Sequence, residues 1–193
     1  MDEDKRQRIL LTAMQLFNKT GFHATPTSQI AKESKVSVGT LFNYFPSKEV
    51  LIREIYTEIK IHSKESFLDH IKDCYTLKEN LENMWSAIIM WGLENPDEFN
   101  YLELFIHSPF MNSFLNDKVM GMYTKFRTLI LKSISPSTIC IDYPEFSMMF
   151  IDNAIHATTR FMLQNEIDDI KHFISSSFDL LWNGFSYKNS LFN

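Results

Sequence analysis

Residues 36–51, VSVGTLFNYFPSKEVL, are the stretch that decides the fold. Ser37 is suited to cap a short helix, because a serine hydroxyl accepts a hydrogen bond from the free N–H groups of the first turn. Pro46 ends that helix, since the residue before a proline is disfavoured in the helical region. Ser47 then caps a long helix that is expected to end near His70. The stretch therefore predicts a short helix, a sharp break and a long helix.

The residues before this stretch predict two further helices. Apolar residues recur at helical spacing over residues 5–19, and Gly21 follows where a helix favours a left-handed cap. Thr25 and Pro26 form a start signal, a capping hydroxyl followed by a proline at the first helical position, for a helix that extends to about Ser34. Two short helices joined by a tight turn, and preceded by a longer one, are the pattern of a helix-turn-helix.

Charge is unevenly distributed along the chain. Between Lys5 and Lys48 there are seven lysines and arginines and one acid, Glu33, which together give a net charge of +6. The whole chain carries −5, so the remainder carries −11. A basic segment of this size attached to an acidic body is the electrostatic pattern of a DNA-binding head on a larger core.

The rest of the chain is expected to be helical as well, because no sustained alternation of apolar and polar residues predicts a strand. Further helices are expected over residues 77–94, 97–107, 111–134, 144–165 and 167–185. The predicted fold class is all-α, with about nine helices. A three-helix helix-turn-helix DNA-binding domain occupies residues 1–48, and a C-terminal helical domain occupies residues 49–193.

Three segments, Gly21 to Thr25, Ile30-Ala31 and residues 36–51, closely resemble the DNA-binding domain of the TetR family of repressors. The resemblance covers about the first 55 residues, and the remainder is similar only in length and helical character. It implies an all-α homodimer in which each third helix enters the major groove of double-stranded DNA. It also implies that residues 49–193 bind an effector and form the dimer, and that the effector releases DNA by shifting the long fourth helix.

Residue types in the predicted head suit contacts with DNA. Gly39 allows the backbone to approach DNA closely, and Asn43, about one turn later, is able to hydrogen-bond an adenine edge. Lys48 and the hydroxyls near helix starts suit phosphate oxygens. Together with the resemblance, these residue types give the predicted DNA-binding set: Thr27, Ser28, Ser37, Gly39, Thr40, Phe42, Asn43, Tyr44 and Lys48.

Two positions depart from the family pattern. Phe42 stands where the family often has tyrosine, so it lacks a phosphate-directed hydroxyl and either presses on thymine methyl groups or packs within the protein. Lys35 stands where the family often has glycine, and we expect it to adopt a left-handed conformation that costs a non-glycine residue about 1 kcal/mol. The third helix contains no arginine, which removes the commonest specific contact to guanine and favours A·T-containing half-sites.

Residues 49–193 are rich in aromatic and methionine side chains, which either fill a helical core or line an apolar cavity. Such a cavity would suit a small hydrophobic or aromatic effector. The candidate ligand-binding residues are Trp85, Trp91, Phe105, His107, Tyr123, Arg127, Asn153 and His156. The resemblance assigns the dimer interface to the last two helices, where the candidates are Phe150, Ala154, Ala157, Phe161, Phe178, Leu181 and Trp182.

Other classes of protein find little support in the sequence. No segment approaches the roughly 20 apolar residues of a membrane span, and the charged N-terminus leads into no signal-peptide core, so a cytoplasmic protein with reduced Cys74 and Cys140 is expected. The scattered histidines and the lack of a phosphate loop predict no enzyme, metal site or cofactor. Two alternatives stay open: a regulator that works without an effector or is activated by one, and a helical interaction protein with a vestigial DNA-binding head.

Overall fold

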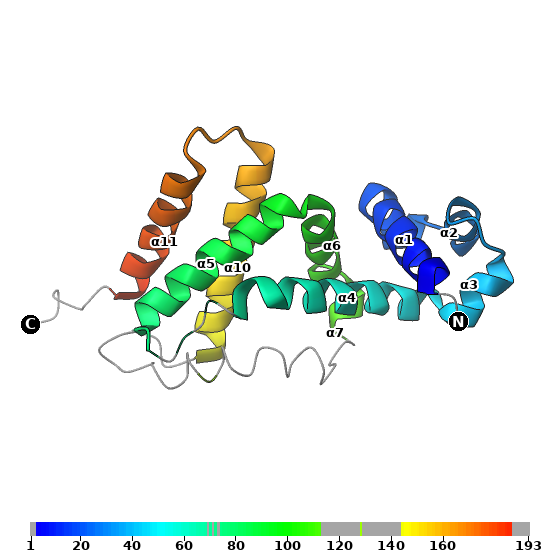
Figure 1. Ribbon diagram of the computed structural model, residues 1–193, viewed down its shortest axis with the longest axis horizontal. Coiled ribbons are helices and arrows are strands. Elements are labelled where there is room, and N and C mark those ends of the chain that lie inside the picture. Colours follow the sequence, from blue (N-terminus) through cyan, green and yellow to red (C-terminus); the bar gives the residue numbers. More distant parts are fainter. Residues whose placement is uncertain are drawn as a thin grey trace, which may run out of the picture. The chain divides into compact units, whose positions relative to one another are not determined.

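The computed structural model describes residues 3–68, 70, 72, 74–112, 128 and 144–186, and the regular structure within them is α-helical (Figure 1). The helices are α1 (Glu3–Ala24), α2 (Thr27–Glu33), α3 (Val38–Tyr44), α4 (Lys48–Leu68), α5 (Leu77–Glu94), α6 (Pro96–Ile106), α7 (Pro109–Asn112), α10 (Pro144–Gln164) and α11 (Ile170–Ser186). The all-α prediction is confirmed. The helix expected over residues 111–134 lies, beyond Asn112, almost entirely outside the described residues, as does Cys140.

Among the described helices, none is long and apolar enough to cross a membrane.

The chain packs as two compact units. Unit 1 consists of Met1–His62 and Asn95–Val119 and includes α1 to α3, most of α4, α6 and α7. Unit 2 consists of Ser63–Glu94 and Met120–Asn193 and includes the end of α4, α5, α10 and α11. The sequence divides the chain by function at residue 48, where α4 begins, and that functional division stays a prediction.

The core of unit 1 is formed by the inward faces of its helices. Ile9 and Phe17 of α1, Leu41 of α3 and Ile52 of α4 are all 0% exposed. Tyr101 of α6 is equally buried, and its hydroxyl donates a 2.8 Å hydrogen bond to the carbonyl oxygen of Ile52. Burial raises the pKa of Tyr101 well above its ordinary value, so the phenol stays protonated and continues to donate. This bond fastens α6 to the first half of α4, the helix that follows the predicted helix-turn-helix.

Several helix ends in unit 1 follow the predicted capping residues. The Ser37 hydroxyl accepts a 3.0 Å hydrogen bond from the backbone N–H of Thr40 at the start of α3. The Ser47 hydroxyl accepts one of 3.2 Å from the N–H of Val50 at the start of α4. Gly21 has the expected positive φ, 81°, although its ψ of 165° makes a kink after which helical turns continue to Ala24. The predicted breaks before and after α3 are therefore confirmed.

The prediction that Thr25 caps α2 is wrong. Pro26 itself occupies the N-cap, with φ −73° and ψ 145°, so α2 begins one residue later than expected. Thr25 is 0% exposed, and its hydroxyl donates to the carbonyl oxygen of Gly21 over 2.8 Å and lies 2.7 Å from the hydroxyl of Thr20. Its hydroxyl therefore secures the end of α1, because it faces back to Thr20 and Gly21 of that helix instead of forward to α2.

Unit 2 packs α5 against α10 and α11. Trp85 of α5 is 2% exposed, and its indole N–H lies 3.2 Å from both the carbonyl oxygen of Ile174 and the hydroxyl of Ser177. The Trp85 ring lies 6.1 Å from that of Phe178, centroid to centroid. A buried tryptophan contributes a large apolar area to a core, and the hydrogen bonds of its N–H avoid the penalty of an unpaired buried donor. Trp85 is therefore the centre of this core.

Candidate nucleic-acid interface

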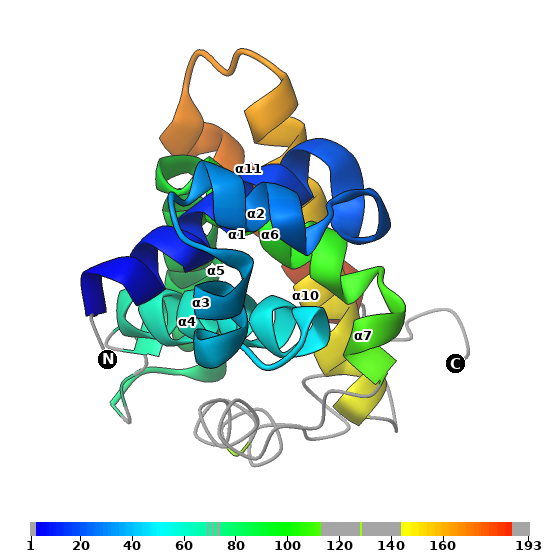
Figure 2. The same cartoon turned by 90° about the vertical axis from the view of Figure 1, so that its right-hand side faces the viewer.

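α3, which Figure 2 shows together with α1 and α2, has one buried and one exposed face. Leu41 is 0% exposed, and Phe45, which directly follows the helix, is 1% exposed. Gly39 and Asn43 are both exposed and lie four residues apart, so they are neighbours on the outer face. The two residues predicted to approach DNA bases are therefore accessible together.

The start of α3 is organised by two hydroxyl groups. The hydroxyl oxygens of Ser37 and Thr40 lie 2.8 Å apart, in addition to the bond that Ser37 accepts from the N–H of Thr40. Thr40 is half-buried and Ser37 is exposed. Both were predicted to contact DNA, and both are already engaged with each other, which fixes the orientation of their hydroxyls at the edge of the exposed face.

The turn between α2 and α3 contains the predicted left-handed residue. Lys35 has φ 56°, as expected from the sequence. Ser34 is buried, its hydroxyl donates to the carbonyl oxygen of Ile30 over 2.7 Å, and its own carbonyl oxygen accepts a 2.8 Å bond from Nε of Arg8 in α1. The turn is thus fastened to both α1 and α2, which fixes the direction in which α3 leaves it.

Gly39 has no evident role in packing. A Cβ atom built at this position would meet only the Ser37 hydroxyl oxygen, at 3.8 Å, an ordinary van der Waals distance. The φ of Gly39 is also not positive, so a side chain is tolerated by the backbone as well. Glycine inside a helix costs roughly 1 kcal/mol relative to alanine. Neither the fold nor helix stability therefore accounts for this glycine.

The other predicted DNA-binding residues surround this face at different exposures. Phe42 is 39% exposed, whereas Tyr44 is half-buried beside Phe45, with ring centroids 6.4 Å apart. The ammonium of Lys48 lies 5.9 Å from the centroid of the Phe17 ring, and partial burial lowers the pKa of Lys48. In the first turn of α2, Thr27 is half-buried and Ser28 is exposed. Their contacts with DNA stay predictions.

Arg6 and Arg8, both counted among the basic residues of the head, are held by acidic and backbone groups of the protein. The guanidinium of Arg6 lies 2.9 Å from the carboxylate of Glu54 and 3.1 Å from that of Glu58. Arg8 pairs with Asp4 at 3.0 Å besides holding Ser34. The sequence counts these arginines as part of a basic footprint, but the structure gives them a role in joining α1 to α4 and to the turn.

The candidate ligand-binding residues that the structure describes are divided between the two units. Phe105 and His107 belong to unit 1, where Phe105 is 0% exposed and stacks on Tyr56 with centroids 4.1 Å apart. His107 is exposed at the end of α6, and in unit 2 Asn153 is exposed on α10. The other described candidates in unit 2, which are buried, are Trp85, Trp91 and His156. Tyr123 and Arg127 lie outside the described residues.

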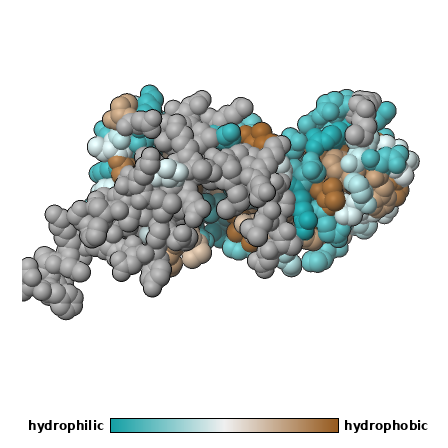
Figure 3. Space-filling view, turned by 90° about the horizontal axis from the view of Figure 1, so that it is seen from below, coloured by the Kyte–Doolittle hydropathy of each residue, from teal (hydrophilic) through white to brown (hydrophobic). Residues whose placement is uncertain are grey.

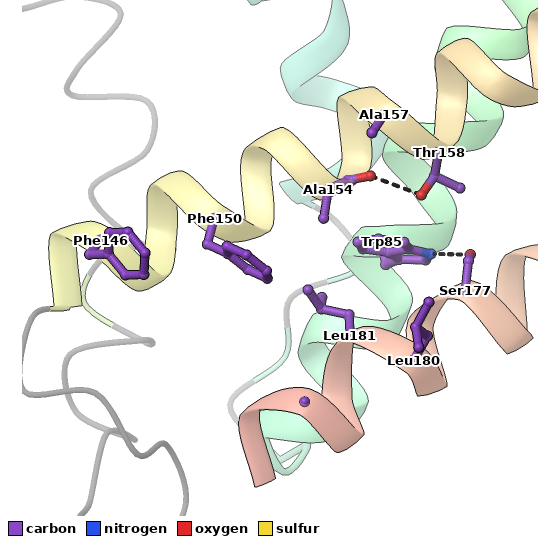
Figure 4. Close-up of a pocket in the computed structure, with 10 residues that line it drawn as sticks. Trp85, Phe146, Phe150, Ala154, Ala157, Thr158, Ser177, Leu180 and Leu181 are labelled. Atoms are coloured by element: carbon purple, nitrogen blue, oxygen red, sulfur yellow. Dashed lines mark hydrogen bonds between the residues drawn. The ribbon is translucent and has the colours of Figure 1, made fainter. Parts of the chain in front are cut away.

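A groove of about 390 Å³ lies between α10 and α11 in unit 2, with Trp85 of α5 projecting between the two helices (Figure 4). It is lined by Trp85, Phe146, Phe150, Ala154, Ala157, Thr158, Ser177, Leu180, Leu181 and Gly184. One candidate ligand residue and four candidate dimer residues therefore share one surface. Phe178, also a dimer candidate, is 1% exposed and is part of the core of its own unit.

The two remaining dimer candidates lie elsewhere on α10 and α11. Phe161 is 48% exposed and stacks on Phe173 with ring centroids 5.6 Å apart, and Trp182 stacks on Phe178 at 6.2 Å. The candidate set omits Phe146 and Leu180, which are 47% and 79% exposed, although Phe146 recurs at helical spacing with Phe150. Their apolar character at helical spacing was a usable signal, but it does not distinguish an exposed face from a buried one.

Within the described part of the chain, no three His, Cys, Asp or Glu side chains gather in a way that could hold a metal ion.

Comparison with known proteins gives consistent matches. The model of the bacterial regulatory proteins of the tetR family matches residues 9–55. A solved tetR family transcription regulator from Shewanella sp. PV-4 is 31% identical, with 95% of this chain and 99% of that chain covered and a TM-score of 0.85. The transcriptional regulator FadR from Bacillus subtilis, solved in complex with stearoyl-CoA, has the same fold at 19% identity, with coverage of 93% and 99% and a TM-score of 0.71.

Matches to curated proteins are confined to part of the chain. The HTH-type transcriptional regulator LmrA from Bacillus subtilis (strain 168) is 34% identical over 80 residues, which are 41% of this chain and 43% of that protein. The chain spans less than half the length of the first curated relatives that it matches. The Shewanella protein, by contrast, is matched over nearly its whole length. The chain therefore belongs to the TetR family of bacterial transcriptional regulators, and its helix-turn-helix is the DNA-binding domain of that family.

Proposed function

We propose that the chain is a homodimeric repressor that binds a palindromic operator by placing α3 in the major groove, and that a small hydrophobic or aromatic effector releases it. The observation that carries the proposal is Gly39. It is exposed on α3, leaves room for a Cβ atom, and reduces helix stability. The fold does not need glycine at this position. The absence of a side chain there is explained by the close approach of another molecule. Its place beside Asn43 makes a DNA base edge the fitting partner.

The groups around Gly39 suit the two kinds of contact that a specific DNA complex needs. Asn43 offers an amide that is able to donate to and accept from one adenine edge. Lys48, which begins α4, offers a cation to the phosphate backbone, and Tyr44 offers a hydroxyl. Base contacts specify the sequence and phosphate contacts fix the position, so this division of roles supports sequence-specific binding.

Dimerisation through α10 and α11 is supported by their exposed apolar residues. Among the residues that the structure describes, twelve large hydrophobic residues are prominently exposed. Six of them lie on these two helices: Phe146, Met149, Phe150, Phe161, Ile170 and Leu180. An apolar face of this kind is unfavourable in water unless another surface covers it. A second copy supplies the same face, and two helices from each copy make a four-helix bundle. Successive major grooves on one side of a duplex lie about 34–36 Å apart, so the proposed operator binding requires a dimer with its two α3 helices at that separation.

The effector is proposed to be apolar because Trp85 and Trp91, two of the candidate ligand-binding residues, are buried aromatic side chains of unit 2. Acyl-CoA thioesters are the first compounds to test, since FadR, which has this fold, was solved in complex with stearoyl-CoA. An effector of the proposed kind raises the melting temperature of the chain, because it binds the folded state in preference to the unfolded state. It weakens DNA binding, because it binds the DNA-free form in preference to the DNA-bound form.

Selection of bound sequences from random DNA duplexes, at two salt concentrations, tests the proposal. We expect an inverted repeat to be enriched, with affinity falling by roughly a hundredfold or more between about 50 and 200 mM salt, as several phosphate contacts require. Enrichment of a single, non-repeated site would contradict the dimeric mode of binding. If folded protein enriches no sequence with or without acyl-CoA, the repressor proposal fails.

A further inference from the structure

Two apolar side chains stand on the exposed face of α3. Val38 is 42% exposed and Phe42 is 39% exposed, and their spacing of four residues makes them neighbours along the helix. Leu41 and Phe45, which are 0% and 1% exposed, already provide the inward apolar contacts of this segment. Val38 and Phe42 are therefore additional to the core, and packing within unit 1 leaves more than a third of each uncovered.

This apolar row runs beside a second row of the helix. Gly39 and Asn43 each follow a member of the apolar pair by one residue, and both are exposed. The four residues thus form one continuous face, half apolar and half able to approach or hydrogen-bond a base. Apolar residues also reach the surface elsewhere among the hydrophilic ones (Figure 3). Leu11 on α1 is 54% exposed. Exposure alone is therefore not diagnostic, and the position beside Gly39 and Asn43 is what distinguishes Val38 and Phe42.

α3 itself carries no charged side chain. Its sequence, VGTLFNY, contains no lysine, arginine, histidine, aspartate or glutamate. A helix without cations lacks the forked contact to guanine, and one without carboxylates lacks the usual acceptor for the amino group of cytosine. In the major groove, the feature that an apolar side chain is able to recognise is the C5-methyl group of thymine.

We propose that Val38 and Phe42 together read thymine methyl groups in the half-site, and that they determine its sequence jointly with Asn43. The inference rests on the proposed function, because it requires α3 in the major groove. It assigns to Val38 a role in specificity and gives Phe42 a function that needs no hydroxyl. The half-site then contains at least one thymine whose methyl group is covered in the complex.

Replacement of thymine by deoxyuridine tests the proposal on the duplex enriched by selection. The exchange removes one methyl group and keeps every hydrogen-bonding group of the base pair. We expect the affinity of the chain to fall about fourfold for each covered methyl, the effect of burying one such group, and to be unchanged for thymines outside the half-sites. The ratio of the affinity for thymine to that for deoxyuridine should fall from about fourfold towards one in Val38→Ala and in Phe42→Ala, each at the thymine that the replaced side chain contacts. Leu11→Ala, the matched change of an exposed apolar residue outside α3, should keep the ratio.

The outcomes separate this inference from the proposed function. If an inverted repeat is enriched but binds equally well with deoxyuridine at every position, or contains no thymine in its half-sites, the methyl-reading role is wrong and the DNA-binding proposal stands. If no duplex is enriched, both fail. The comparison of thymine with deoxyuridine uses the unmodified protein, so it decides the question even if an alanine variant does not fold.

Discussion

Lys35 shows how a single residue is strained at the turn before α3. Its φ of 56° is in the left-handed region, where a side chain costs on the order of 1 kcal/mol and glycine costs little. This conformation was predicted from the resemblance to the TetR family, because Lys35 stands where that family often has glycine. The strain is tolerated since Ser34 and Arg8 hold the neighbouring backbone.

Replacing Lys35 by glycine is expected to stabilise the chain. Glycine removes the strain energy of the left-handed conformation in the folded state, and this gain exceeds the entropy that glycine adds to the unfolded chain. The free energy of unfolding should therefore rise by about 0.5–1 kcal/mol. Chemical denaturation measures this change. Lys32→Gly, in the helical part of α2, is the matched control and should destabilise by up to about 1 kcal/mol. A neutral or destabilising effect of Lys35→Gly would show that the turn is not strained.

Gly39 is expected to respond in opposite directions in two measurements. Gly39→Ala should raise the free energy of unfolding by about 0.5–1 kcal/mol, because a Cβ atom fits and alanine favours the helix. The same change should weaken binding to the selected duplex by about tenfold or more, because the methyl group occupies the space of a base edge. Denaturation and anisotropy titration of one preparation give both values. Unchanged DNA affinity would remove the argument on which the proposed function depends.

The helices themselves were largely predictable, since their boundaries depend on local chemistry. Ser37, Pro46 and Ser47 set the limits of α3 and the start of α4 through capping and the conformational restriction by proline. Thr25 was assigned wrongly because a threonine before a proline suits either a helix start or a bond back to the preceding helix. That choice depends on where the carbonyl oxygens of α1 lie in space, which the sequence does not contain.

Removal of the α3 cap is expected to destabilise the recognition helix. Ser37→Ala leaves the backbone N–H of Thr40 without its 3.0 Å acceptor and should lower the free energy of unfolding by about 1 kcal/mol. Ser28→Ala, at an exposed serine in the first turn of α2, serves as the control and should change it by less than about 0.5 kcal/mol. Equal effects of the two substitutions in thermal or chemical denaturation would mean that the Ser37 cap contributes nothing.

At the scale of the whole molecule, the sequence could not separate ligand-binding from dimer-forming residues. Trp85 was selected for the effector and Phe150 for the dimer, yet both line the groove between α10 and α11. Helical periodicity identifies an apolar face and not the molecule that covers it. The same limit applies to Phe178, whose periodicity suits an interface but whose side chain completes the core around Trp85.

Charge placed on the exposed α10 face is expected to break the proposed dimer. Phe150 is 50% exposed, so Phe150→Glu should leave the fold of one chain intact while it disfavours burial against a second copy. Sedimentation analysis should show a shift from dimer to monomer, together with weaker binding to the inverted repeat. Met90→Glu, at a 38% exposed methionine of α5, is the control and should remain dimeric. A Phe150→Glu chain that stays dimeric would place the interface elsewhere.

The central claim, that the exposed face of α3 reads bases, is tested most directly by measuring the affinity of wild type and Asn43→Ala for the selected duplex and for single base-pair variants of it. We predict that wild type discriminates by about tenfold or more at one A·T pair of each half-site and that Asn43→Ala loses this discrimination at that pair alone. Lys48→Ala should weaken binding to all the duplexes by a similar factor, as expected for a phosphate contact. If Asn43→Ala keeps the full discrimination at every position, α3 does not read DNA in the proposed way.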